Sequence, residues 1–157
     1  KPHRFREVRI IGHRGSRSEG LPENTLAAFA DAHAESVDCL ELDVWCTSDG
    51  EVCVFHDKDF QRMCGASTSQ VPNGGVPDVG SVTLLPDLNP TAPEQRDRFI
   101  PGNSTHCRIP TLEQVLKSIP ADLPLIVEFK QGGPIVEKVL ALLVAHGRLQ
   151  PPPSSSS

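Results

Sequence analysis

The sequence has no tyrosine, one tryptophan, six phenylalanines and no run of basic residues among its 157 residues. Its net charge is −5, so the chain offers neither aromatic platforms for bases nor a broad positive surface for a phosphate backbone. Nucleic acid is therefore not expected as a partner. An anionic phosphate substrate stays open, because a site needs only local positive charge from a metal ion or from a few arginines and lysines.

Long apolar runs are also lacking. No stretch is long enough to span a bilayer, and the N-terminus does not have the pattern of a signal peptide. The chain begins at Lys1 rather than at Met, so membrane association through segments outside this sequence stays open.

Cysteines are few, and their spacing shows no pairing pattern. Their number is odd and no C-x-x-C motif occurs, so neither a disulfide framework nor a zinc site is expected. We expect reduced, mostly buried thiols. Unpaired cysteines favour an intracellular protein, cytoplasmic or membrane-associated, and the sequence leaves the compartment open. The five positions are Cys39, Cys46, Cys53, Cys64 and Cys107.

In place of these features the chain has an alternating stretch of apolar and acidic residues at 39–45. As a β-strand it places Glu41 and Asp43 on one face and Leu40, Leu42 and Val44 on the other. Two neighbouring carboxylates repel each other and need a cation between them, and hard divalent cations prefer carboxylate oxygens. The alternative for an isolated pair of this kind is an edge strand with a solvated acidic face.

Three further strands are expected, and each ends in ionisable residues. A short buried strand at 8–12 leads into His13 and Arg14, and a strand at 51–57 carries His56. An Asp-Gly turn at 47–50 predicts a tight, hairpin-like connection before the second of these. A strand at 123–130 brings Glu128 and Lys130 to its end.

Helices are expected between these strands. One is capped by Asn24 or Thr25 and ends at 36–38, and another begins at Thr111 with a capping box to Gln114. A last helix spans about 135–146, and its expected buried stripe is Val136, Val139, Leu140, Leu143 and Val144. We place one domain at 1–146, with an irregular insertion at 64–106, and a disordered Pro/Ser tail at 147–157.

The order of elements is β-α-β-β-insertion-α-β-α, which predicts an α/β protein. Sites in parallel α/β folds form at the carboxyl ends of the strands. There three carboxylates could hold one hard cation, two histidines could supply base and acid, and Arg14 and Lys130 could neutralise an anion. This set suits hydrolysis of a phosphate ester.

At these residues the chain resembles the glycerophosphodiester phosphodiesterases. The matching motifs are His13-Arg14-Gly15, Pro22-Glu23-Asn24-Thr25, Leu40-Glu41-Leu42-Asp43-Val44, Val54-Phe55-His56-Asp57 with Arg62, Ile109-Pro110-Thr111-Leu112 and Val127-Glu128-Phe129-Lys130. The Cys64-Gly65 step and the Leu85-Pro86 stretch resemble the eukaryotic branch that includes lysophospholipase D-type enzymes.

The resemblance implies a TIM-type (β/α)8 barrel and metal-dependent hydrolysis of glycerophosphodiesters to glycerol 3-phosphate and an alcohol. It implies Glu41, Asp43 and Glu128 as ligands of Mg²⁺ or Ca²⁺, and His13 and His56 as the acid–base pair. Arg14 and Lys130 are the implied substrate contacts. The substrate would be a glycerophosphodiester or a lysophospholipid, and the sequence leaves the leaving alcohol and the oligomeric state open.

A complete barrel of this type has eight strands and about 250 residues. This chain supplies about the first four strands, so we expect an incomplete barrel that is poorly active alone. The alternative function is a truncated, inactive fragment or a non-catalytic binding product of such an enzyme. A zinc site in an unrelated hydrolase is a weaker alternative, because no H-x-H or H-E-x-x-H spacing occurs.

Overall fold

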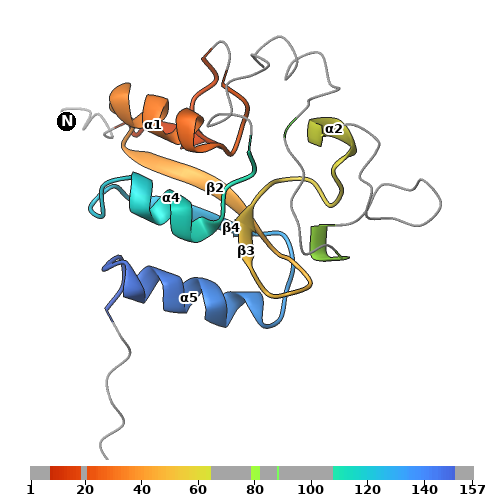
Figure 1. Ribbon diagram of the computed structural model, residues 1–157. Helices are drawn as coiled ribbons and strands as arrows, with labels where there is room; N and C mark the ends of the chain where they lie inside the picture. The colour runs from red at the N-terminus through yellow and green to blue at the C-terminus, as the bar shows by residue number, and fades with distance from the viewer. Residues whose placement is uncertain (1–7, 19–20, 65–78, 82–87, 89–107, 151–157) are drawn as a thin grey trace, which may run out of the picture.

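The computed structural model describes residues 8–18, 21–64, 79–81, 88 and 108–150 (Figure 1). Nearly all of the insertion predicted at 64–106 lies outside these residues, as do positions 151–157 of the predicted tail. The proposed domain boundaries therefore stay predictions.

Strand β2 (Cys39–Cys46) is the centre of a four-stranded sheet. Strand β1 (Ile11–His13) pairs parallel with its first half, and β3 (Val52–Val54) pairs antiparallel with its last residues. Strand β4 (Leu125–Phe129) pairs parallel along 40–44 of β2, a range that overlaps both other pairings. Strand β4 therefore occupies the opposite edge of β2, and β1, β2 and β4 run in the same direction.

The direction of β3 corrects the prediction that four parallel strands each bring their carboxyl end to the site. Strand β2 continues three residues beyond Asp43, and the predicted turn at 47–50 then reverses the chain. Strand β3 returns toward Asp43, and the Phe55 N–H donates to the Asp43 carbonyl over 3.0 Å. His56 thus reaches the level of Asp43 from the opposite direction.

Helices α1 (Leu26–Ala34), α4 (Leu112–Ser118) and α5 (Ile135–Ala145) lie one below another along one side of the sheet (Figure 1). Their apolar side chains pack against those of β2 that alternate with the two acids. Leu40, Leu42 and Val44 are all fully buried in this core. The acidic residues of β2 consequently lie on the face of the sheet that points away from the helices.

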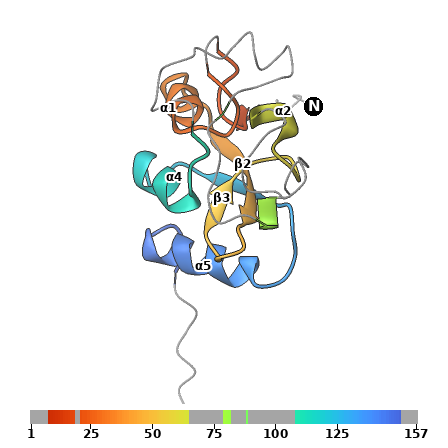
Figure 2. The same ribbon diagram turned by 45° about the vertical axis from the view of Figure 1, so that its right-hand side comes forward.

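A second, smaller core lies on the other side of the β2–β3 hairpin. Helix α2 (Gln61–Cys64) and the short 3-10 turn η1 (Val79–Ser81) contribute to it, and Figure 2 shows both apart from the helical layer. Its buried members include Phe55, Phe60 and Met63. This core fixes the chain that follows β3, where the predicted His56 site residue lies.

The helix ends follow the predicted capping residues. The Thr25 hydroxyl accepts from the Ala28 N–H, and Thr111 and Gln114 form the predicted capping box. The last helical residue of α1 is Ala34, and Ser36 stops the helix by adopting a left-handed conformation with φ +62°. This agrees with the predicted helix end at 36–38.

Two apolar segments are more exposed than the sequence predicts. Ile10 and Ile11, expected in a buried strand, are 60% and 48% exposed, because β1 is an edge strand of only three residues. On α5 the predicted buried stripe includes Leu140, which is 46% exposed, whereas Val139 is fully buried. No helix among the described residues is both long and apolar enough to cross a membrane.

The partial sheet with helices on one face is consistent with an incomplete barrel. Closure into a TIM barrel stays a prediction, since β1 and β4 are open edges among the residues that the structure describes.

Gly15 joins β1 to the start of α1 and tolerates no side chain. Its φ is +86°, and an added Cβ would lie 2.7 Å from the Ala28 carbonyl carbon. We expect Gly15→Ala to lower the free energy of unfolding by about 2–4 kcal/mol, from backbone strain plus overpacking. Urea denaturation measures the loss.

Gly133→Ala is the matched control for this change. Gly133 has a similar φ of +83° but no heavy atom within 4 Å of its added Cβ. Gly133→Ala should therefore lose stability through backbone strain alone, without a steric clash. An equal loss in both variants would contradict the steric explanation.

Candidate functional site

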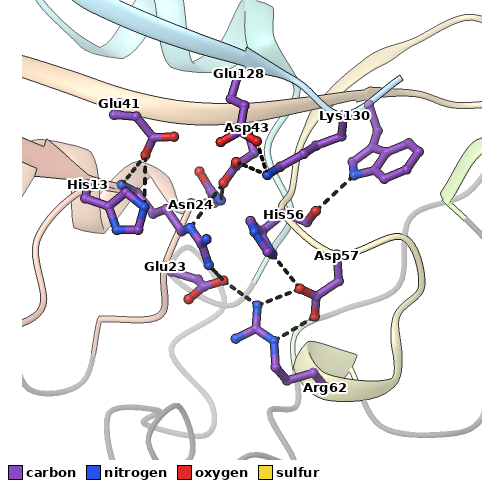
Figure 3. Close-up of polar contacts among 12 residues, drawn as sticks. His13, Glu23, Asn24, Glu41, Asp43, His56, Asp57, Arg62, Glu128 and Lys130 are labelled. Atoms are coloured by element: carbon purple, nitrogen blue, oxygen red, sulfur yellow. Dashed lines mark hydrogen bonds and ion pairs between the residues drawn. The ribbon is translucent and has the colours of Figure 1, made fainter. Parts of the chain in front are cut away.

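Three carboxylates converge on the face of the sheet opposite the helices. Glu41 and Asp43 come from β2, and Glu128 comes from β4, where its Cα is the register partner of Asp43 (Figure 3). One oxygen from each lies within 4.8 Å of the others. Oxygen ligands lie about 2.0–2.6 Å from Mg²⁺ or Ca²⁺ and so up to about 5 Å from each other. The donor set and its spacing thus fit one hard divalent cation.

Asp43 is fully buried, and its two oxygens have different surroundings. Oδ2 accepts from the Asn24 Nδ2 amide over 2.8 Å and lies 3.3 Å from Arg14 Nε. Oδ1 is buried and forms an ion pair with Lys130 Nζ over 3.0 Å. Because Asn24 and Arg14 already hold Oδ2, Oδ1 is the oxygen of Asp43 that is suited to a cation in the cluster.

Glu41 is held from the side of β1. Its Oε2 accepts from the Arg14 backbone N–H over 2.9 Å, and His13 Nε2 lies 3.9 Å from the same oxygen. Burial raises the pKa of Glu41, and the nearby charge of Asp43 raises it further. Both effects disfavour a second negative charge here, as expected where carboxylates share a site without a full complement of positive charge.

His56 enters the site from the hairpin and is held at two points. Its Nδ1 lies 2.7 Å from Asp57 Oδ1, and the Trp45 indole N–H donates to its backbone carbonyl over 3.3 Å. Its side chain is 31% exposed, compared with 51% for His13. The His56 ring is therefore held more firmly than the His13 ring.

Arg62 and Glu23 form the outer part of the same network. Arg62 Nε donates to Asp57 Oδ2 over 2.7 Å, its Nη2 donates to Glu23 Oε1, and Arg14 Nη1 donates to that oxygen over 3.1 Å. Burial raises the pKa values of Glu23 and Asp57, but hydrogen bonds and charge from Arg62 outweigh it. Both pKa values end below their usual range, so both carboxylates stay ionised near neutral pH.

Two residues beside the carboxylates adopt strained backbone conformations. Arg14 and Asn24 both have φ of 58°, which is rare for residues with a side chain. The Asn24 N–H donates to the Arg14 carbonyl over 2.9 Å, so the two strained positions support each other. Such strain is often concentrated at functional sites.

The structure brings the predicted site residues together. His13, Arg14, Glu41, Asp43, Glu128 and Lys130 are linked by contacts around the carboxylates, and His56 lies beside them (Figure 3). Their chemical roles stay predictions. Sequence reasoning missed Glu23, Asn24, Asp57 and Arg62 as members of the site, although all four stood in the quoted motifs.

Three of the five cysteines lie on strands β2 and β3. Cys39, Cys46 and Cys53 form no disulfide, which agrees with the prediction of reduced thiols. The expectation of mostly buried thiols is wrong for the described residues, because Cys53 is buried whereas Cys39, Cys46 and Cys64 are half-buried. Burial raises the pKa of the Cys53 thiol to about 12.

The sequence matches the model of the glycerophosphoryl diester phosphodiesterase family over residues 13–138. It is 35% identical over 142 residues to rat lysophospholipase D GDPD1, covering 89% of this chain and 42% of that protein. It is 30% identical to Arabidopsis thaliana glycerophosphodiester phosphodiesterase GDPD4, covering 84% of this chain and 37% of the relative. The chain thus spans less than half the length of these curated relatives.

Solved structures show the same relationship. The glycerophosphoryl diester phosphodiesterase domain of a Mycobacterium tuberculosis protein superposes with a TM-score of 0.65 at 27% identity, over 90% of this chain and 50% of that one. The glycerophosphodiester phosphodiesterase from Agrobacterium tumefaciens also gives 0.65, at 25% identity, over 92% and 55%. The family model covers every predicted site residue. The chain therefore belongs to the glycerophosphoryl diester phosphodiesterase family.

Proposed function

We propose that this chain carries the site of a metal-dependent phosphodiesterase that hydrolyses glycerophosphodiesters to glycerol 3-phosphate and an alcohol. The observation that carries the proposal is the convergence of Glu41, Asp43 and Glu128 within 4.8 Å, beside His56. A purely solvated acidic face would not bury Asp43 completely. The same convergence favours a catalytic site over the non-catalytic alternative.

Glu41, Asp43 and Glu128 would hold a Mg²⁺ or Ca²⁺ ion. When bound, the ion would supply positive charge that polarises the phosphoryl oxygens. Asn24 and Arg14 would keep Asp43 in position by holding Oδ2, so that Oδ1 remains directed into the cluster. The different contacts of the two carboxylate oxygens support a role for Asp43 as a metal ligand.

His13 and His56 would transfer the protons of the reaction. The oxygen of a water molecule attacks phosphorus, the bond from phosphorus to the alcohol oxygen breaks, and the proton of the attacking water passes to one imidazole. The other imidazole donates its proton to the departing alkoxide. His56 is suited to the base role because Asp57 holds Nδ1, which leaves Nε2 for the reacting proton.

Arg14 and Lys130 would neutralise the charge that develops on the phosphoryl group. Lys130 forms an ion pair with Asp43 and another with Glu128, at the rim of the carboxylate cluster. A phosphate oxygen bound next to the cation would lie within reach of this ammonium group. An arginine and a lysine at such a position stabilise transition-state charge that a carboxylate cluster alone would repel.

The relatives suggest two substrate classes. One relative is named a glycerophosphodiester phosphodiesterase and another a lysophospholipase D. Phosphodiesters of unacylated glycerol and phosphodiesters of acylated glycerol are therefore both candidate substrates. The described residues support the proposed phosphodiester chemistry and leave the choice of alcohol to the experiment.

Product analysis by ³¹P NMR tests the proposal. The purified chain is incubated with glycerophosphocholine or with lysophosphatidylcholine, after removal of metal by a chelator and again after addition of Mg²⁺ or Ca²⁺. We expect the diester resonance to be replaced by that of a phosphate monoester only when metal is present. Full activity in chelator, or no activity in a folded chain under any metal condition, would overturn it.

A further inference from the structure

The guanidinium of Arg62 holds two carboxylates that belong to different parts of the site. Nε donates to Asp57 Oδ2 over 2.7 Å and Nη2 donates to Asp57 Oδ1 over 3.0 Å, which makes a bidentate pair. Nη2 also donates to Oε1 of Glu23, which is 39 positions away in the sequence. One arginine thus ties the segment after β3 to the turn before α1.

Each of these carboxylates in turn holds a side chain of the site. Asp57 Oδ1 lies 2.7 Å from His56 Nδ1, and Glu23 Oε1 accepts from Arg14 Nη1 over 3.1 Å. Arg14 Nε then lies 3.3 Å from Asp43 Oδ2. A continuous path of hydrogen bonds and ion pairs therefore runs from the His56 imidazole through Arg62 to the carboxylate cluster, as the dashed lines of Figure 3 show.

We propose that Arg62 is a positioning residue that sets the tautomer of His56 and the place of Arg14 together, through Asp57 and Glu23. The proposal rests on the function above, because it gives Arg62 a part in the same reaction. A carboxylate on Nδ1 keeps the hydrogen of the neutral imidazole on that nitrogen, and Nε2 then retains its lone pair for the proton of the nucleophile. Glu23 keeps the Arg14 guanidinium beside Asp43, where a phosphoryl oxygen would lie.

Arg62 fits this task better than a lysine would. Its planar fork presents several donors in fixed directions, so it can hold both carboxylates at once, whereas an ammonium group is a single point charge. Its side chain is 27% exposed and those of Glu23 and Asp57 are less exposed, so losing this bidentate arginine should also lower the stability of the fold. The tautomer of His56 and the KM of the folded fraction report on geometry separately from that loss.

The first test is the tautomer of His56. The chain is labelled with ¹⁵N-histidine, and the two ring nitrogen shifts are read at a pH where the imidazoles are neutral, with His56→Gln used to assign the resonances. In the wild type the hydrogen should reside on Nδ1. In Arg62→Ala it should move toward Nε2, and Arg62→Lys should give an intermediate result. The resonances of His33 and His146 should not change.

Arg148→Lys is the matched control for this experiment. Arg148 is also partly buried and donates to the backbone carbonyls of Leu123 and Pro120, away from the carboxylate cluster. Its replacement tests whether loss of any structural arginine disturbs the histidine. We expect the His56 tautomer to stay on Nδ1 in this variant.

Steady-state kinetics on a glycerophosphodiester provides the second readout. We expect Arg62→Ala to lower kcat/KM about 10- to 100-fold, as for other groups that orient a catalytic side chain. Because both His56 and Arg14 are affected, kcat should fall and KM should rise, with partial recovery in Arg62→Lys. A variant that is merely less stable would lose active protein without a change in KM.

The outcomes separate this proposal from the function on which it rests. An unchanged His56 tautomer in Arg62→Ala overturns the positioning role, even if the wild type hydrolyses its substrate. A shifted tautomer in a chain that hydrolyses no glycerophosphodiester supports the positioning of His56 and overturns the proposed function. A shifted tautomer with lower kcat and higher KM supports both.

Discussion

Replacing Asp43 by asparagine should abolish binding of a divalent cation. The change removes the negative charge of the one fully buried carboxylate in the cluster and leaves a neutral amide of nearly the same shape. Changes to groups that only support a metal ligand cost 10- to 100-fold in affinity, so loss of a ligand should cost about 100-fold or more. Isothermal titration calorimetry with Mg²⁺ and Ca²⁺ measures the loss, and hydrolysis should fall with it.

Glu113→Gln is the matched control, since it also removes one carboxylate charge. Glu113 pairs with Lys117 on the exposed surface of α4, outside the cluster. Cation affinity should be unchanged in this variant. If both substitutions weaken binding equally, the effect comes from net charge, and the assignment of Asp43 as a ligand fails. Circular dichroism establishes that Asp43→Asn remains folded.

Replacing His56 by glutamine should lower kcat by about 10²- to 10⁴-fold, the usual contribution of a positioned general acid or base. The glutamine amide can still hydrogen-bond Asp57 but cannot exchange a proton near neutral pH. KM and cation affinity should change little, because His56 contributes no ligand to the carboxylate cluster. Single-turnover measurements at saturating metal isolate this effect on the chemical step.

His33→Gln serves as the control for His56. His33 lies exposed on α1, in the last turn of that helix. It should leave kcat unchanged. A loss in His56→Gln that added imidazole restores would strengthen the proton-transfer role, whereas undiminished kcat would contradict it.

The acidic pair could be predicted from local periodicity alone. A strand places alternate residues on one face, so Glu41 and Asp43 had to share a side once 39–45 was recognised as a strand. Glu128 joins them because β4 pairs parallel with β2 and aligns with Asp43. That alignment depends on sheet register, which the sequence suggested only through the order of its elements.

The hairpin-like connection at 47–50 was predicted and is confirmed, but its consequence for the direction of β3 was not drawn. The Asp-Gly turn at 47–50 indicates a hairpin, and a hairpin makes the two strands antiparallel. The exposed faces of β1 and α5 were not predictable, because periodicity identifies an apolar face and does not say whether anything covers it. Arg62 was missed for a related reason, since its partner Glu23 is distant in sequence.

The central claim is that one cation, held by Glu41, Asp43 and Glu128, enables the hydrolysis. The most direct test compares two titrations of the same preparation, cation binding by calorimetry and glycerophosphodiester hydrolysis at increasing cation concentration. We predict that both reach half-saturation at the same concentration, and that Glu128→Gln shifts both to higher concentration by the same factor. Hydrolysis that persists in chelator, or that keeps its cation dependence while Glu128→Gln weakens binding, would contradict the claim.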